Sequence, residues 1–145
     1  NDPLLRGRYT GISSHHTTAL FTRATLVGVA MSLKDCMQTL EELDVKMTRL
    51  RIIGGGAKGM LWRQIVSDVL GMKLEKVRVD DSSFGTAMLA AVGTGWFGSF
   101  AEAAERCVEI ESVSEPIASN CEAYEELFKK YKAIHDALAP IYGGR

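Results

Sequence analysis

The fold is decided by one stretch of the chain, Arg51-Ile52-Ile53-Gly54-Gly55-Gly56-Ala57-Lys58-Gly59-Met60-Leu61-Trp62. An apolar strand runs into three glycines and then into an amphipathic helix. Glycine allows backbone torsions with positive φ, and it lets the main chain approach a ligand without a Cβ in the way. The first turn of the following helix offers unpaired N–H groups and the positive end of its dipole. The stretch therefore predicts a cradle for an anion, and we expect a nucleotide phosphate there.

Two nucleotide-binding motifs compete for this stretch. A P-loop is excluded, because Met60 stands where that motif needs a lysine after its last glycine. A dinucleotide fingerprint stays open, because Gly54, Gly56 and Gly59 match Gly-x-Gly-x-x-Gly between a strand and a helix. Asp80 follows about twenty residues later, where a ribose-binding acid would lie. An NAD-type dinucleotide-binding domain of an oxidoreductase is therefore an alternative.

Length and charge narrow the possible partners. The 145 residues suffice for one domain with a sizeable core. Seventeen basic and eighteen acidic residues leave a net charge of −1 without a basic stripe, so we expect no nucleic-acid partner. The chain shows neither a signal segment nor an apolar run long enough to cross a membrane, so we expect a cytoplasmic protein without membrane contact.

Other side chains that could carry chemistry are interpreted as structural. His15-His16 lacks nearby thiols or carboxylates that would complete a metal site, so we expect no metal ligands and assign both histidines to a helix entry. Trp62 is interpreted as a packing residue and not as a platform for a base. Three cysteines are odd in number and widely spaced, which favours reduced thiols over a disulfide framework; they are Cys36, Cys107 and Cys121.

Hydrophobic periodicity predicts alternating strands and helices after a long first helix. Residues 7–12 read as a short extended piece, and Gly71 is expected to end the second helix in a left-handed conformation. Residues 80–83 are expected to cap the third helix, whose small residues should allow close packing against a neighbour. The order of elements implies parallel strands joined by crossover helices, an α/β fold. The expected elements are a helix over 17–43, a strand over 48–53, a helix over 59–70, a strand over 76–79, and helices over 84–92 and 121–138.

Four blocks, in the same order, resemble the C-terminal domain of the FGGY carbohydrate kinases, and of xylulokinases in particular. The first block includes Asp2-Pro3, residues 6–12, and the start of the long helix with His16-Thr17 and Arg23-Ala24. The others are a Gly-Gly-Gly-Ala-Lys segment, a Leu-Trp-Arg-Gln helix ending in Asp-Val-Leu-Gly, and a helix of small residues. They occupy residues 54–58, 61–71 and 84–93.

The resemblance implies an actin-like, ribonuclease H-like ATPase domain that binds ATP while an N-terminal domain holds the sugar. We read residues 1–145 as a single domain, a fragment of the C-terminal domain that lacks the sugar-binding domain and the start of its own domain. In this family the aspartate that activates the sugar hydroxyl lies upstream of the matched region. We therefore expect no catalytic residue in this chain, and neither Asp80 nor Asp81 receives that role. The full-length parent is expected to use ATP and Mg²⁺, and the fragment alone to be inactive.

The resemblance also indicates which residues contact the nucleotide. The backbone of Gly55, Gly56 and Ala57 is expected to lie against it, as the matching loop does in the family. Lys58 is a candidate point charge beside a phosphate, with a solvated surface lysine as the alternative. Met60 is expected to contribute shape and apolar contact near the adenosine.

Two positions depart from the family pattern. Leu20 stands where relatives usually have a polar residue, and Val27 stands where they usually have an acid or an amide. If these positions support the cleft, the protein would be a kinase with altered substrate choice or a catalytically weak actin-like binding domain. The resemblance favours D-xylulose as the sugar and D-xylulose 5-phosphate as the product. An apolar stripe on the last helix could serve a homodimer as well as a core.

Overall fold

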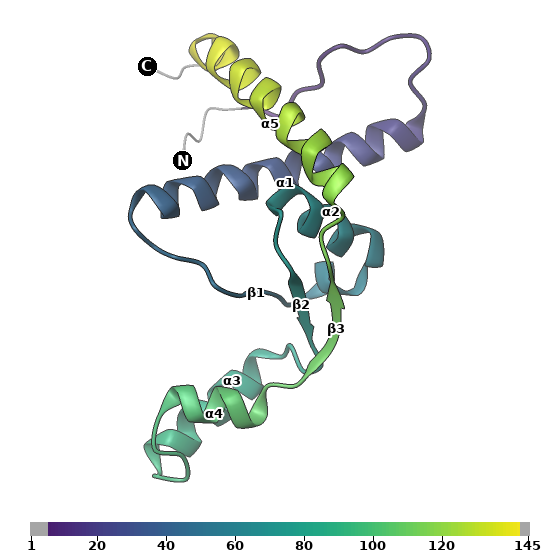
Figure 1. Cartoon of the computed structure of the whole chain (residues 1–145). Helices are drawn as coiled ribbons and strands as arrows, with labels where there is room; N and C mark the ends of the chain where they lie inside the picture. The colour runs from purple at the N-terminus through teal and green to yellow at the C-terminus, as the bar shows by residue number, and fades with distance from the viewer. Residues whose placement is uncertain (1–5, 143–145) are drawn as a thin grey trace.

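The computed structural model describes residues 6–142, so Asp2-Pro3 of the first family block lies outside the described residues. Figure 1 shows a small sheet with three helices, α1, α2 and α5, toward one end and an arm of α3 and α4 at the other. The elements in chain order are α1 (Thr18–Glu42), β1 (Leu50–Ile52), the 3-10 turn η1 (Gly55–Lys58), α2 (Met60–Leu70), β2 (Leu74–Val77), α3 (Ser82–Gly93), α4 (Phe100–Cys107), β3 (Ile110–Ser114), α5 (Ala118–Leu138) and η2 (Ala139–Tyr142).

Most predicted elements are present close to their expected bounds. Gly71 ends α2 with φ of 66°, the left-handed conformation that the sequence predicts. Residues 7–12, expected as a short extended piece, form no strand and no helix. The prediction also missed α4 and β3, which follow one another between the third helix and the last.

The three strands lie in the order β1-β2-β3. β1 and β2 pair in parallel, with Leu50 opposite Leu74, as the strand-helix-strand order predicts. The predicted parallel pair is thus confirmed, whereas β3, which the prediction missed, pairs with β2 in the antiparallel sense and makes the sheet mixed. β3 returns directly along β2 after the α3–α4 arm, and an antiparallel neighbour needs no crossover helix.

The core lies between the sheet and the helices α1, α2 and α5. Helical spacing places one stripe of each helix inward, and β2 contributes Leu74 from the sheet. On α5, Phe128 is buried and Tyr124 and Tyr131 pack against the cluster, whereas Leu127 stays exposed. The stripe on α5 thus serves the core, and a homodimer stays a prediction. The core residues are Val27, Ala30, Met31, Ile65, Val66, Val69, Leu74 and Phe128.

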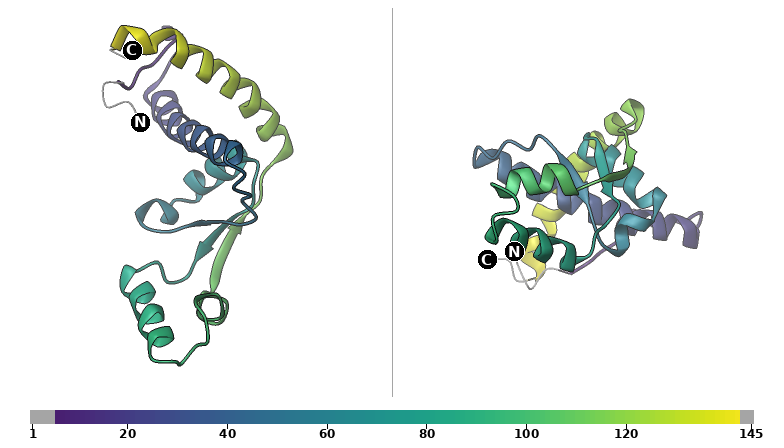
Figure 2. Two further views of the ribbon diagram at one scale, coloured as in Figure 1. Left: turned by 90° about the vertical axis from the view of Figure 1, so that its left-hand side faces the viewer. Right: turned by 90° about the horizontal axis from the view of Figure 1, so that it is seen from below.

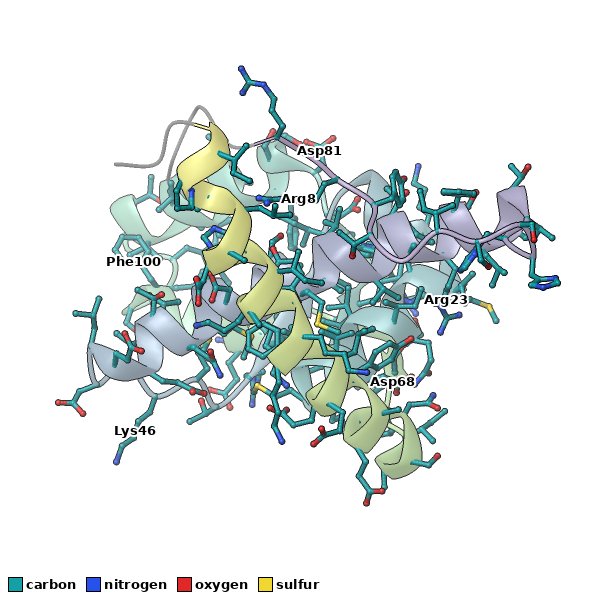
Figure 3. The ribbon with its side chains drawn as sticks, turned by 90° about the horizontal axis from the view of Figure 1, so that it is seen from above. Arg8, Arg23, Lys46, Asp68, Asp81 and Phe100 are labelled. Atoms are coloured by element: carbon teal, nitrogen blue, oxygen red, sulfur yellow. The ribbon has the colours of Figure 1, made fainter. Side chains whose placement is uncertain are left out.

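A buried carboxylate fastens the start of α5 to α2. Asp68 is 2% exposed and accepts hydrogen bonds from the backbone N–H of Ile117 at 2.9 Å and from the side chains of Gln64 and Asn120 at 2.8 Å. Figure 3 places Asp68 beside the N-terminal part of α5. Because an N–H at a helix start has no partner within its own helix, Asp68 supplies the cap that α5 lacks locally.

The helices α3 and α4 form an arm that stands away from the core. Figure 2 shows the pair at the far end of the sheet from α1 and α5. No residue of α3 is buried, and nothing within the described chain lies within 4 Å of a Cβ built on Gly85 or Gly93. The close packing expected of this helix is therefore not found within residues 6–142, because α3 contacts mainly α4 and not the sheet.

The three cysteines are free thiols, as predicted. Cys36 is exposed, whereas Cys107 and Cys121 are partly buried. Within residues 6–142 no helix combines the length and the hydropathy needed to cross a membrane.

We expect Asp68→Ala to destabilise the protein by about 2 kcal/mol, because it removes a buried carboxylate that accepts hydrogen bonds from the Ile117 N–H, Gln64 and Asn120. Thermal and chemical unfolding measure the change. The control is Glu126→Ala, which removes an exposed carboxylate paired with Lys129 and should change stability by less than about 0.5 kcal/mol. Equal effects of the two substitutions would contradict the capping role.

We expect Cys121 to be alkylated more slowly than Cys36 at pH 8. Burial and the neighbouring Asp68 carboxylate raise the pKa of the Cys121 thiol, so less of it is present as the reactive thiolate at that pH. Mass spectrometry after timed iodoacetamide treatment measures the two rates. In denaturant the rates should converge, and a native Cys121 that reacts as fast as Cys36 would refute the prediction.

Candidate functional site

The glycine-rich stretch forms a compact turn between β1 and α2. Gly54 has φ of 78° and ψ of −168°, a conformation that only glycine adopts without strain. The chain then makes the 3-10 turn η1, in which the Ala57 N–H donates to the Gly54 carbonyl at 3.0 Å. Gly59 ends this turn and begins α2. The loop of residues 54–59, here called the glycine loop, is therefore a defined structure.

Asp80 holds the entrance of the glycine loop. Its carboxylate accepts a hydrogen bond from the Gly54 N–H at 2.9 Å. The expectation that Asp80 helps to cap α3 is therefore wrong, because the parallel pairing of β1 and β2 brings the segment after β2 next to Gly54. Asp81 alone caps α3, accepting from the Ser83 N–H at 2.7 Å. Hydrogen bonds from the Ser83 hydroxyl and the Ser83 N–H lower the pKa of the Asp81 carboxyl.

Trp62 supports the middle of the glycine loop. A Cβ built on Gly56 would lie 3.1 Å from the Trp62 Nε1, which leaves little room for any larger residue at that position. Trp62 is partly buried and packs against the core, so the prediction that it is a packing residue is confirmed. The indole of Trp62 therefore packs against the glycine loop at Gly56.

Arg63 holds the end of η1 from the inside. Its guanidinium Nη1 donates a hydrogen bond to the Ala57 carbonyl, and both residues are buried, Arg63 at 9% and Ala57 at 0% exposure. Sequence reasoning missed both Arg63 and the Asp80 contact. The position of Asp80 at the end of the strand after the loop was a usable signal, because carboxyl ends of neighbouring parallel strands meet at one edge.

The outer side of the loop is open. Gly55, Gly56, Lys58 and Met60 are exposed, and no atom lies within 4 Å of a Cβ built on Gly55. α2 has neither a side-chain cap nor an acidic residue in its first turn, so its first N–H groups and its dipole remain available to an anion. Of the five predicted site residues, four are therefore exposed, and the fifth, Ala57, is buried.

The two positions that depart from the family pattern lie apart from this loop on α1. Val27 is 8% exposed and belongs to the core, where an apolar side chain fits. Leu20 is 49% exposed and does not belong to the core. Within residues 6–142 no group of three or more His, Cys, Asp or Glu side chains is arranged to hold a metal ion.

The fold and the loop agree with one protein family. The sequence profile described as "FGGY family of carbohydrate kinases, C-terminal domain" matches residues 1–94. The chain belongs to the FGGY family of carbohydrate kinases, and its fold is the actin-like ATPase fold of these sugar kinases.

Two of the relatives that the chain resembles in sequence are xylulose kinases. The chain is 34% identical over 92% of its length to a xylulose kinase of Staphylococcus epidermidis and 33% identical over 92% of its length to one of Bacillus subtilis. It spans 27% of each of these relatives. The crystal structure of xylulose kinase from Rhodospirillum rubrum superposes with a TM-score of 0.87 at 26% identity, covering 97% of this chain and 29% of that one.

We expect Gly54→Ala to destabilise the protein by about 1–2 kcal/mol, because alanine is strained at this backbone conformation. Gly55→Ala is the matched control: both sites are free of neighbours within 4 Å, and only Gly54 has positive φ. Gly55→Ala should change stability by less than about 0.5 kcal/mol. Comparative thermal unfolding measures both, and indistinguishable melting temperatures would show that the loop is not held in this conformation.

Proposed function

We propose that this chain is the ATP-binding part of a carbohydrate kinase and that the glycine loop holds the nucleotide phosphates. One observation carries the proposal. Gly55 and Gly56 lie exposed, without side chains, in the turn η1 that leads into the uncapped N-terminus of α2. Backbone N–H groups at such a place bind phosphate oxygens. Membership of the FGGY family supports ATP as the nucleotide.

Two exposed side chains beside the glycines are proposed as further contacts. Lys58 would act as a point charge on a phosphate, and Met60, which is 76% exposed, would make apolar contact with the adenosine. Ala57 has no exposed surface, so we propose a different role for it from the nucleotide contact expected from the sequence. It fixes the loop from the inside through its packing and through the hydrogen bond that its carbonyl accepts from Arg63.

The proposed reaction of the full-length protein is transfer of the γ-phosphate of ATP to a sugar hydroxyl. N–H donors of the loop would orient the phosphates and stabilise their charge during transfer. Because the chain spans 27% of its relatives, we place the group that accepts the hydroxyl proton, and the residues that contact the sugar, in the remainder of the protein. Mg²⁺ is proposed to bind through the ATP phosphates, the usual way in which kinases hold it.

Xylulose is the proposed sugar, supported by the names of the two bacterial relatives. The dinucleotide alternative is not kept. The chain belongs to a kinase family, and the Asp80 carboxylate that would hold a ribose is engaged by the Gly54 N–H. A catalytically weak binding domain is retained as an outcome of the test below, because Leu20 departs from the family pattern and is exposed.

The test measures ADP release by the full-length protein with ATP, Mg²⁺ and a panel of ketoses and polyols. Turnover on D-xylulose is the expected result. Gly55→Leu should raise the KM for ATP at least tenfold while leaving the KM for the sugar within about twofold, because the side chain would fill the open face of the loop.

The outcomes separate the competing functions. Nucleotide binding without turnover on any sugar would indicate the weak binding domain. An unchanged KM for ATP in Gly55→Leu would move the nucleotide site away from the glycine loop. Binding of NAD in place of ATP would overturn the kinase proposal.

A further inference from the structure

Arg63 is a buried cation whose charge has no acid partner in the described chain. It is 9% exposed, and its Nη1 donates a hydrogen bond to the uncharged Ala57 carbonyl. Its Nε is buried without a hydrogen-bond partner among residues 6–142. By contrast, Arg51, Arg78 and Arg106 are paired with glutamates on partly or largely exposed surfaces.

This arrangement is unfavourable in the absence of an anion. Burying a guanidinium removes its hydration, and a carboxylate normally compensates for that loss. The position of Arg63 in α2 raises the free energy of burying this charge further. Arg63 lies at the end of the first turn of the helix, where the helix dipole disfavours positive charge. Two sources of positive charge therefore lie beside the loop, the helix start and Arg63, while the Asp80 carboxylate lies at its entrance.

The position of Arg63 relative to the exposed loop indicates a function for its buried charge. The guanidinium binds the carbonyl of Ala57, the residue that directly follows the exposed Gly55 and Gly56. It thus lies under the surface on which the nucleotide phosphates are proposed to rest. A charge held in a water-poor environment acts more strongly on a nearby anion than an exposed lysine such as Lys58 does.

We propose that Arg63 is a positioning residue for the nucleotide: it holds the glycine loop through Ala57 and makes the loop selective for the phosphate-bearing ligand by its buried charge. The inference rests on the proposed function of the loop. It assigns to Arg63 no direct contact with the nucleotide. Its consequence is a preference for ADP over adenosine that depends on the charge at position 63.

The decisive variant is Arg63→Gln in the full-length protein. Glutamine removes the charge and keeps an N–H donor for the Ala57 carbonyl, so the loop can retain its shape. Titration with ADP and with adenosine, followed by calorimetry or fluorescence, gives the two dissociation constants. We expect ADP binding to weaken at least tenfold and adenosine binding to stay within twofold of wild type.

Two further variants control for effects on folding. Arg63→Lys keeps the charge, and we expect it to restore most of the preference for ADP over adenosine. Arg51→Gln removes an arginine from neighbouring β1 whose partner is Glu75, and it should leave both dissociation constants within twofold. If Arg63→Gln fails to fold, Arg63→Lys carries the test: retention of the preference supports the inference, and its loss overturns it.

The failures of the two proposals are distinguishable. Wild-type protein that binds neither ADP nor ATP would overturn the proposed function and this inference with it. ADP binding by Arg63→Gln at wild-type strength, or an equal weakening of ADP and adenosine, would overturn the inference alone and leave Arg63 a purely structural residue.

Discussion

Parallel pairing of β1 with β2 is the constraint on which the candidate site depends. It places the carboxyl ends of both strands at one edge, so that the chain leaving β1 and the chain leaving β2 meet there. The meeting is fixed by a hydrogen bond between the Gly54 N–H and the Asp80 carboxylate. A one-residue slip of β1 against β2 would carry Gly54 away from that acceptor and turn the side chains of β1 to the opposite face. The sheet register thus sets the direction in which the glycine loop leaves the fold.

The glycine loop has an anchored inner side and an open outer side. Asp80 binds its entrance, Trp62 packs behind Gly56, and Arg63 binds the carbonyl of Ala57. These contacts leave Gly55 and Gly56 exposed. A loop that is fixed before its ligand arrives needs little further ordering on binding, which favours affinity. Rigidity on one side and exposure on the other are the two properties that a phosphate cradle requires.

The sequence predicted the parts of the structure that are encoded locally. Glycines between an apolar strand and an amphipathic helix define the loop and α2 within a dozen residues, and Gly71 marks the end of that helix. A local signal for α4 was also present but overlooked. Ser99 caps α4 by accepting from the Glu102 N–H, and Glu102 reaches back to the Gly98 N–H, close to a capping box.

Long-range contacts were not predictable from one sequence. β3 joins the sheet beside β2, and the glutamates in it and next to its ends meet basic residues there, as when Glu111 binds Lys76 at 2.6 Å. Nothing in the linear order shows which of many acids and bases will pair. The same holds for Arg63, because its role depends on a buried contact with Ala57 and on an Nε that finds no hydrogen-bond partner among residues 6–142. Helical spacing placed Arg63 on α2, but it could not reveal the charge under the loop.

A crystal structure of the full-length protein with ADP would show whether the glycine loop receives the phosphates of a nucleotide. We expect phosphate oxygens within hydrogen-bonding distance, about 3 Å, of the backbone N–H groups of Gly55 or Gly56, with the contact between Arg63 and Ala57 retained. A nucleotide bound elsewhere, with the glycine loop in solvent, would contradict it.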